Sequence, residues 1–241
     1  MPVLLEVCVD SPEGLEAAIA GGADRIELCS ALDLGGLTPT PGLIAAAARA
    51  PVPVYAMIRP HARSFVWTPA DAEAMQIEID AVRAAGLAGV VLGAALPDGA
   101  LDVTLLETLR ARAQGLGATL HRVFDLVPDP AAALEAAIAL GFERILTSGG
   151  AVRAEDGLAH LVALERQAAG RIGIMPGSGV SAANVARIVQ AVGASEVHAS
   201  CREAFTTDDS KGVELGFFAA RQGVTSASAV QALKRALEDI D

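Results

Sequence analysis

Hydrophobic and polar positions follow two alternating patterns along this chain. Short runs rich in β-branched and other apolar residues predict buried strands. These runs lie at 4–9, 24–29, 53–59, 89–93, 118–124, 144–148, 172–175 and 196–200. Longer stretches rich in Ala and Leu follow each run and predict helices. These stretches lie at 12–20, 41–49, 69–85, 102–114, 130–140, 155–169, 182–192 and 226–240.

Several of the predicted helices carry a start signal, a capping residue followed by proline. The signals are Ser11-Pro12, Thr40-Pro41, Thr68-Pro69 and Asp129-Pro130. Eight strand–helix units in 241 residues are typical of a TIM (β/α)8 barrel, for which ~250 residues is usual. A doubly wound open sheet is the alternative, but no G-x-G-x-x-G fingerprint follows the first strand. No linker-like stretch divides the chain, so we expect one domain over residues 1–241.

The sequence also contains an internal echo. The segment Leu15-Glu16-Ala17-Ala18-Ile19-Ala20 recurs as Leu134-Glu135-Ala136-Ala137-Ile138-Ala139. The match continues through Gly22 and Gly141, Arg25 and Arg144, and Ile26 and Ile145. The two copies lie four units apart, as two half-barrels of one structural plan would. Chance similarity in an Ala-rich chain is the other explanation.

Composition narrows the range of partners. The net charge of −11 argues against nucleic acid or an anionic membrane, because both attract basic surfaces. No apolar run approaches the ~20 residues of a transmembrane helix, and the N-terminus lacks the basic region of a secretory signal. Three cysteines suit a reducing compartment better than a disulfide framework. We therefore expect a cytoplasmic protein.

Polar residues gather at the carboxyl ends of the predicted strands, where TIM barrels place their active sites. The candidates for acid/base or binding roles are Glu6, Glu27, Arg59, His121, Asp125 and His198. His121 and Asp125 lie four residues apart and so on one face of a predicted strand. A carboxylate beside an arginine stays ionised, whereas one in an apolar wall becomes a weak acid. The alternative for the two glutamates is structural ion pairing with Arg25, Arg59 or Arg122. The alternative for the two histidines is a role as satisfied core residues.

Two Glu-x-Cys segments end the first two predicted strands, Glu6-Val7-Cys8 and Glu27-Leu28-Cys29. Cys8 and Cys29 occupy equivalent places on adjacent strands, which lie ~4.8 Å apart. Two thiols at that separation suit one soft ion such as Cu(I). Small buried thiols without a ligand are the alternative. A hard cation held by the oxygens of Glu6, Glu27 and Asp10 ranks below a metal-free site.

Glycine-rich loops follow the sixth and seventh predicted strands. Ser148-Gly149-Gly150 and Gly177-Ser178-Gly179 place backbone N–H groups beside helix starts, where anions bind. The candidate anion-binding residues are Ser148, Gly149, Gly177, Ser178 and Gly179. Turn geometry alone also explains glycines in such loops.

Several motifs in order resemble the CutC family, named for copper homeostasis. They are the two Glu-x-Cys segments with their flanks and the segments 35–39, 58–60, 121–125, 146–149 and 175–179. The resemblance spans residues 4 to about 202. It implies a cytoplasmic TIM barrel, often a homo-oligomer, with Cu(I) ligands matching Cys8 and Cys29. One loop departs from the family pattern: after Pro60 the chain reads His61-Ala62-Arg63-Ser64-Phe65 where the family has Arg-Gly-Gly-Asp-Phe.

Two functions follow from these residues. The first is a copper-homeostasis protein that binds Cu(I) through Cys8 and Cys29. The second is a metal-independent barrel enzyme that acts on a small anionic metabolite, with Arg59 and the glycine loops holding the anion and Glu6, Glu27 or His121 moving a proton. An adaptor role would require the barrel mouth to be blocked by side chains.

Overall fold

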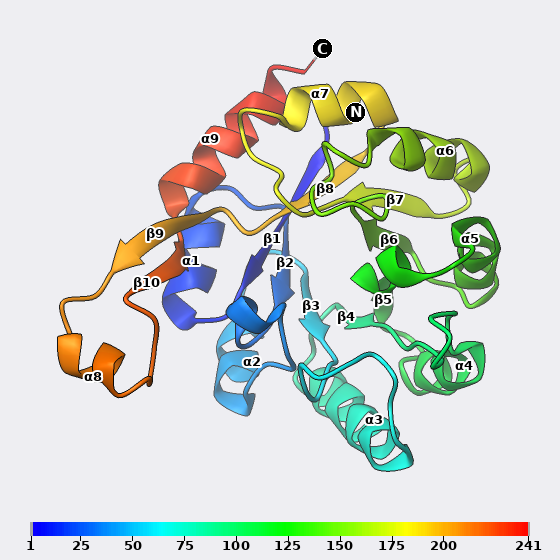
Figure 1. Ribbon diagram of the computed structural model, residues 1–241, viewed down its shortest axis with the longest axis horizontal. Coiled ribbons are helices and arrows are strands. Elements are labelled where there is room, and N and C mark those ends of the chain that lie inside the picture. The colour runs from blue at the N-terminus through cyan, green and yellow to red at the C-terminus, as the bar shows by residue number, and fades with distance from the viewer. Residues whose placement is uncertain (1, 241) are drawn as a thin grey trace.

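The computed structural model describes residues 2–240. Eight parallel strands form a barrel in the order β7-β6-β5-β4-β3-β2-β1-β8, and β7 lies beside β8 (Figure 1). The strands are β1 (Leu4–Val9), β2 (Arg25–Leu28), β3 (Val54–Met57), β4 (Gly89–Leu92), β5 (Gly117–Leu120), β6 (Arg144–Thr147), β7 (Gly173–Pro176) and β8 (Glu196–Ala199). The prediction of a TIM barrel is confirmed.

A helix follows each of the first seven strands, and a final helix closes the chain (Figure 1). The helices are α1 (Pro12–Ala20), α2 (Pro41–Ala47), α3 (Pro69–Ala84), α4 (Val103–Arg112), α5 (Pro130–Ala139), α6 (Leu158–Ala168), α7 (Val185–Val192) and α9 (Ala227–Glu238). The start signals read from the sequence act as caps. For example, the Thr68 hydroxyl accepts from the Asp71 N–H, and the Asp71 carboxylate accepts from the Thr68 N–H. Each cap satisfies N–H groups that have no partner inside the helix.

The fifth predicted strand is shorter than expected. It ends at Leu120, and the 3₁₀ helix η2 occupies Arg122–Leu126. His121 caps this turn, because its Nδ1 accepts a hydrogen bond from the Val123 N–H at 3.1 Å. The expectation that His121 and Asp125 share one strand face is therefore wrong. A side-chain acceptor at position 121 favours a turn over a further strand residue.

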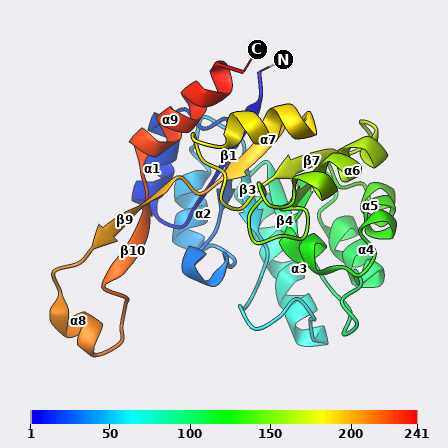
Figure 2. The ribbon, with the colours of Figure 1, turned by 45° about the horizontal axis from the view of Figure 1, so that its top comes forward.

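An arm between β8 and α9 was not predicted. It consists of β9 (Arg202–Thr206), α8 (Ser210–Glu214) and β10 (Arg221–Thr225), with β9 and β10 paired antiparallel. The arm projects away from the barrel beside α1 (Figures 1 and 2). The sequence did not predict these strands because they have no buried apolar face: Phe205 of β9 and Val224 of β10 are 50% and 48% exposed.

A layer of charged side chains crosses the interior of the barrel. The Arg25 guanidinium donates to Glu6 and, at 2.6 Å, to Glu196. Arg144 reaches the same Glu196 carboxylate from β6. Arg25 and Arg144 also lie over the ring of Tyr55, 5.5 and 4.9 Å from its centre. Pairing is what makes this burial tolerable, since an isolated buried charge is costly.

Glycines make room for this layer. A Cβ at Gly89 or Gly117 would overlap the Tyr55 side chain, and one at Gly173 would overlap the Glu196 carboxylate. These positions are the first residues of β4, β5 and β7. Barrel interiors are close-packed, so large side chains on some strands require small ones opposite.

The internal echo corresponds to equivalent structure. The turns from α1 to β2 and from α5 to β6 both place a glycine at positive φ, Gly22 at 92° and Gly141 at 71°. The arginine that follows each turn, Arg25 or Arg144, enters the barrel and reaches Glu196. The shared structural plan is the better of the two explanations.

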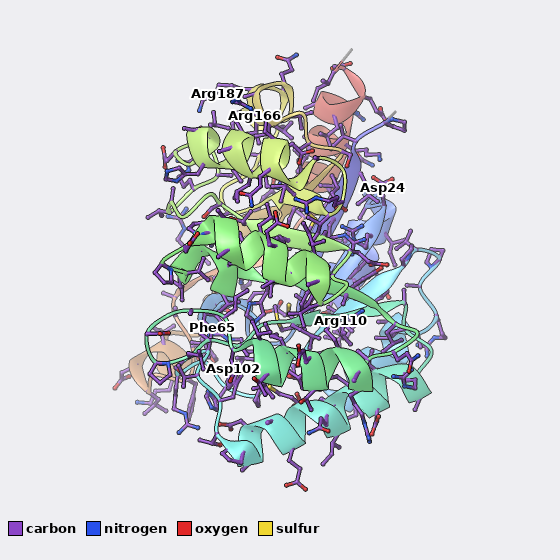
Figure 3. The ribbon with its side chains drawn as sticks, turned by 90° about the vertical axis from the view of Figure 1, so that its right-hand side faces the viewer. Asp24, Phe65, Asp102, Arg110, Arg166 and Arg187 are labelled. Carbon is purple, nitrogen blue, oxygen red and sulfur yellow. The ribbon has the colours of Figure 1, made fainter. Side chains whose placement is uncertain are left out.

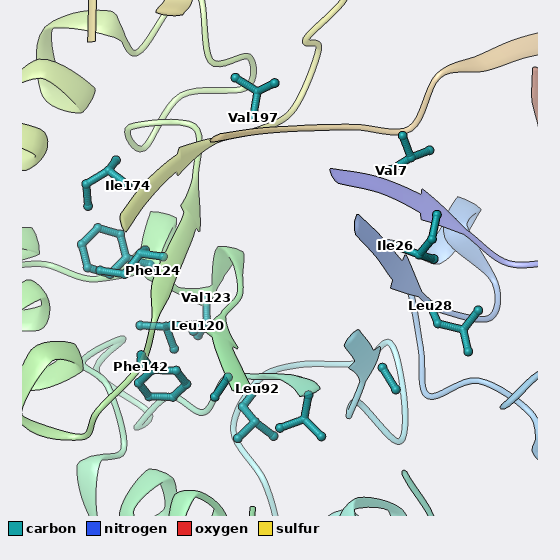
Figure 4. Close-up of a cluster of buried hydrophobic side chains, with 14 of the residues drawn as sticks. Val7, Ile26, Leu28, Leu92, Leu120, Val123, Phe124, Phe142, Ile174 and Val197 are labelled. Atoms are coloured by element: carbon teal, nitrogen blue, oxygen red, sulfur yellow. The ribbon is translucent and has the colours of Figure 1, made fainter. Parts of the chain in front are cut away.

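The apolar core lies between the barrel and its helices. Val7, Ile26 and Leu28 point outward from β1 and β2, and Leu92, Leu120 and Ile174 point outward from β4, β5 and β7 (Figure 4). Along each strand, alternate residues therefore point outward into the apolar core or inward into the barrel interior, where the charged layer lies. Within residues 2–240, no helix is both long and apolar enough to cross a bilayer.

The fit between Gly89 and Tyr55 is testable by substitution. Gly89→Ala should lower the free energy of unfolding by about 1–3 kcal/mol, the range for an overpacked core, measured by urea denaturation. Gly42→Ala is the matched control, because a Cβ there meets nothing within 4 Å in helix α2. The control should be neutral or stabilising. An equal loss in both variants would show that the Tyr55 ring does not limit position 89.

Candidate functional site in the barrel mouth

A cavity of about 360 Å³ opens at the carboxyl ends of the strands. Its wall includes Cys8 from β1, Glu27 from β2 and His198 from β8. Arg59, Phe65, His121 and Arg122 complete one side, and Ser178, Gly179 and Arg202 the other. The predicted gathering of polar groups at this end is what the structure shows.

Cys8, Glu27 and His198 form a cluster of candidate metal ligands. One ligand atom from each lies within 4.8 Å of the other two, and all three residues are buried. The strand register produces this cluster, because Cys8 pairs with Glu27 across β1 and β2. Cys29 lies two residues farther along the chain than Glu27, the register partner of Cys8. The expectation that Cys8 and Cys29 occupy equivalent places is therefore wrong, since strands in a closed barrel are staggered.

Cys29 faces a different environment from Cys8. It is fully buried and packs with Tyr55, Met57 and Val91. Its thiol lies 3.6 Å from Glu27 Oε2, toward which it donates. Burial and the charge of Glu27 raise the pKa of the Cys29 thiol well above its usual value. Cys29 is thus a neutral thiol behind the cluster, unless a ligand removes its proton.

The two glutamates differ although both are buried. Burial alone would raise the pKa of Glu6, but the hydrogen bond with His198 and the charge of Arg25 outweigh it and lower the pKa to about 2. Burial dominates at Glu27 and raises its pKa. Glu6 is thus a permanent anion in the charged layer, and Glu27 is the weak acid in the pocket wall.

His198 links these two carboxyl groups. Its Nδ1 lies 2.8 Å from Glu6 Oε1, and its Nε2 lies 3.8 Å from Glu27 Oε2. Burial opposes the charged ring, but Cys8, Glu27 and Glu6 outweigh it and raise the pKa of His198 well above its usual value. Glu6 fixes the ring so that Nε2 faces the pocket.

Arg59 and His121 meet at the Phe65 ring. The Arg59 guanidinium lies 4.8 Å from the centre of the ring, and the His121 ring centre is also 4.8 Å away. Burial and the charge of Arg59 lower the pKa of His121 to about 3. His121 is therefore neutral at physiological pH, unlike His198. The loop that departs from the family pattern still supplies Phe65 to the pocket wall.

Asp125 turns away from this pocket and organises the loop after β6. Its carboxylate accepts from the Thr147 hydroxyl, from the N–H groups of Ser148 and Gly150, and from Arg122. The Gly149 N–H donates to Thr147 Oγ1. The N–H groups of Ser148, Gly149 and Gly150 are therefore engaged within the chain. This geometry makes Asp125 a structural hub and does not support an anion site at Ser148 and Gly149.

The loop after β7 does reach the cavity. Ser178 and Gly179 line it, both with positive φ, at 77° and 70°. Gly177 lies against Leu146 and His198, where a Cβ would overlap the Leu146 side chain. Gly177 therefore allows close packing beside His198. Ser178 and Gly179 remain candidates for contact with a ligand.

Sequence reasoning did not single out several pocket residues. Phe65 and Met57 carry no chemical signature of their own, and Arg202 was not assigned a role. Arg202 donates to Asp33 at 2.7 Å and to the Gly223 carbonyl, so it joins the arm to the rim of the pocket. Only long-range contacts identify such residues, because nothing local in the sequence marks them.

Together these features define a class: a TIM barrel with a buried polar pocket at its mouth. The model of the CutC family matches residues 3–203. A CutC family protein of Rhizobium meliloti (strain 1021) is 56% identical over 236 residues, covering 98% of this chain and 96% of the relative. One from Caulobacter vibrioides (strain NA1000 / CB15N) is 59% identical over 198 residues, covering 82% and 81%.

A solved structure agrees with these relatives. The putative copper homeostasis protein CutC from Streptococcus agalactiae is 31% identical, with a TM-score of 0.79 over 82% of this chain and 98% of that one. The chain belongs to the CutC family. The match to the family model ends at residue 203, where the arm begins.

The neutral state of His121 leads to a pH prediction. Its ring resonances in NMR spectra should not titrate between pH 8 and pH 5, with assignment by comparison with His121→Asn. An unfolded histidine binds a proton near pH 6.5, whereas His121 in the folded protein does not until about pH 3. His121 therefore lowers the stability of the folded state as the pH falls from about 6.5 toward 3. A midpoint near 6.5 for the His121 resonance would contradict the buried, neutral assignment.

Proposed function

We propose that this chain is a cytoplasmic copper-homeostasis protein of the CutC type that binds Cu(I) in its barrel mouth. The observation that supports this proposal is the cluster of Cys8, Glu27 and His198. A thiolate is the preferred ligand of Cu(I), and an imidazole nitrogen also suits copper. Cys8 and the Nε2 of His198 are therefore the proposed primary ligands, with Glu27 beside them.

The surroundings of His198 fit a ligand role. A histidine that ligates a metal through one nitrogen usually donates from the other to a carboxylate. Glu6 supplies that carboxylate at Nδ1, and Arg25 holds Glu6 in place. Binding requires Cys8 to be a thiolate and Nε2 to lose its proton, so uptake of the ion releases protons. Ligation by Cys29 stays a prediction.

Cu(I) titration of single cysteine variants tests this proposal. The parent protein should bind about one Cu(I) per chain, measured by competition with a chromogenic Cu(I) chelator under anaerobic conditions. Cys8→Ser should weaken binding at least tenfold, because a hydroxyl is a poor ligand for a soft ion. Cys201→Ser is the matched control, since Cys201 is also a free thiol but is not part of the cluster.

The Cys29→Ser variant separates two forms of the proposal. A loss equal to that of Cys8→Ser would make Cys29 a second thiolate ligand. Unchanged binding would leave Cys8 as the sole thiolate, with His198. If Cys8→Ser takes up Cu(I) as tightly as the parent, copper does not bind at this cluster.

A second function has its own support, that of an enzyme acting on a small anionic metabolite. Three buried polar atoms in the pocket wall have no hydrogen-bond partner within residues 2–240: Glu27 Oε1, Arg59 Nε and His121 Nε2. A buried polar group without a partner costs about 1–3 kcal/mol. All three atoms belong to residues that line one cavity. This favours a polar ligand that satisfies them, and Glu27 is the weak acid placed to exchange a proton with it.

A thermal-shift screen of carboxylated and phosphorylated metabolites tests the second function. A ligand of this pocket should raise the unfolding temperature of the parent and lose most of that effect in Arg59→Ala. Arg187→Ala is the control, because Arg187 lies on the outer surface of α7 (Figure 3). A ligand that stabilises Arg59→Ala as well as the parent binds elsewhere. Assembly into a homo-oligomer stays a prediction.

A further inference from the structure

The tautomer of His121 is fixed by its own backbone. Nδ1 accepts a hydrogen bond from the Val123 N–H at 3.1 Å, so Nδ1 carries no proton. A neutral imidazole then carries its proton on Nε2. That nitrogen is buried, has no partner within the described chain, and belongs to a residue that lines the cavity and is 3% exposed. At Nε2, His121 is therefore a hydrogen-bond donor rather than a base.

Arg59 presents a second unused donor. Its Nη1 donates to the carbonyls of Leu34 and Gly36, at 2.9 and 3.0 Å, and its Nη2 points to the Ala62 carbonyl. Its buried Nε has no hydrogen-bond partner within residues 2–240. These contacts and the Phe65 ring hold the guanidinium in one orientation, so its position is preorganised. Arg59 is 7% exposed.

The charges around this donor pair select the ligand. Arg122 is engaged by Asp125 and Ser148, and Arg202 by Asp33 and the arm. The loop after β6 has its N–H groups engaged by Asp125 and Thr147. In the wall that follows β3 and β5, Arg59 has no carboxylate partner within residues 2–240 and lies beside a neutral histidine. The other cation of the cavity, His198, is paired with Glu6. One unpaired positive charge matches a monoanion better than a phosphate dianion.

We infer that Arg59 Nε–H and His121 Nε2–H together bind the carboxylate group of a small monocarboxylate. This inference deepens the second proposed function by naming its substrate class, and it does not depend on copper. A planar carboxylate accepts two N–H donors at its two oxygens. Phe65 provides an apolar wall beside it, and the cavity of about 360 Å³ has room for a ligand of small-metabolite size.

The arrangement has a chemical consequence. Fixed donors in a site shielded from water stabilise an oxygen that holds or gains negative charge. A neutral histidine suits this task because it donates a hydrogen bond without adding a formal charge. Arg59 and His121 thus hold the ligand. Glu27, on the strand next to β3, lines the same cavity and has one carboxyl oxygen without a partner within residues 2–240.

Binding of sodium pyruvate, used as the probe, tests the inference. Isothermal titration calorimetry at constant ionic strength should give saturable binding of pyruvate, and binding of inorganic phosphate at least tenfold weaker. In NMR spectra, pyruvate should shift the His121 Nε2–H resonance downfield, as a new hydrogen bond requires. Arg59→Lys and His121→Phe should each weaken pyruvate binding at least tenfold.

A matched control separates loss of the site from general damage. Arg110 also lies over a phenylalanine, 5.5 Å from the Phe142 ring, and has an unpaired buried nitrogen. It lies at the far end of α4 from Asp102 and Phe65 (Figure 3). Arg110→Lys should bind pyruvate like the parent. If a site variant proves unstable, the His121 resonance of the parent protein still decides the question.

Several outcomes would overturn the inference. For the parent protein, they are equal affinity for phosphate and pyruvate, no binding at millimolar pyruvate, and an unchanged His121 resonance in saturating pyruvate. For the variants, the contradicting result is an affinity for pyruvate that is unchanged in both Arg59→Lys and His121→Phe. Tight phosphate binding that is lost in Arg59→Lys would sink the carboxylate assignment and leave the anion-binding enzyme standing. Cu(I) uptake should be the same in Arg59→Lys as in the parent, so the copper proposal fails or survives separately.

Discussion

The constraint on which this structure depends is the charged layer buried inside the barrel. Arg25 and Arg144 enter from nearly opposite strands and share the Glu196 carboxylate, while Glu6 binds Arg25 from β1. Removing one partner from such a network leaves an uncompensated buried charge, which is strongly destabilising. The layer requires glycine at the starts of three strands. It also includes Glu6, whose carboxylate contacts His198 at the base of the pocket.

Through Glu6, the layer also sets the chemistry of the mouth. The hydrogen bond with His198 and the charge of Arg25 keep the pKa of Glu6 low. Glu6 in turn orients the His198 ring, whose pKa is raised by Cys8, Glu27 and Glu6. Glu27 lies one step nearer the opening and has a raised pKa, because burial there outweighs its favourable neighbours. Two buried glutamates of the same repeated tripeptide pattern thus have pKa values shifted in opposite directions. His121 and His198 differ in the same way, one neutral beside Arg59 and the other charged between carboxylates.

The barrel mouth therefore contains two sets of side chains that suit different kinds of ligand. Cys8 and His198 offer soft and nitrogen ligands, as a copper site needs. Arg59 and His121 offer N–H donors, as an anion site needs. Glu27 lies within reach of the first set and faces the cavity shared with the second. A copper-homeostasis protein and an enzyme are thus both compatible with one pocket, and single-residue variants distinguish them.

The sequence by itself determined the barrel, since apolar periodicity and helix caps are local signals, and most predicted elements differ from the observed ones by only a few residues. It also located the mouth, because strand ends in a barrel converge. Tertiary structure decided the rest. The stagger of the strands places Cys8 opposite Glu27 instead of Cys29. The side-chain cap of His121 ends the fifth strand and separates His121 from Asp125. The arm forms from two strands that show no apolar alternation. Register, tautomer and charge depend on neighbours distant in the chain, which local sequence patterns do not encode.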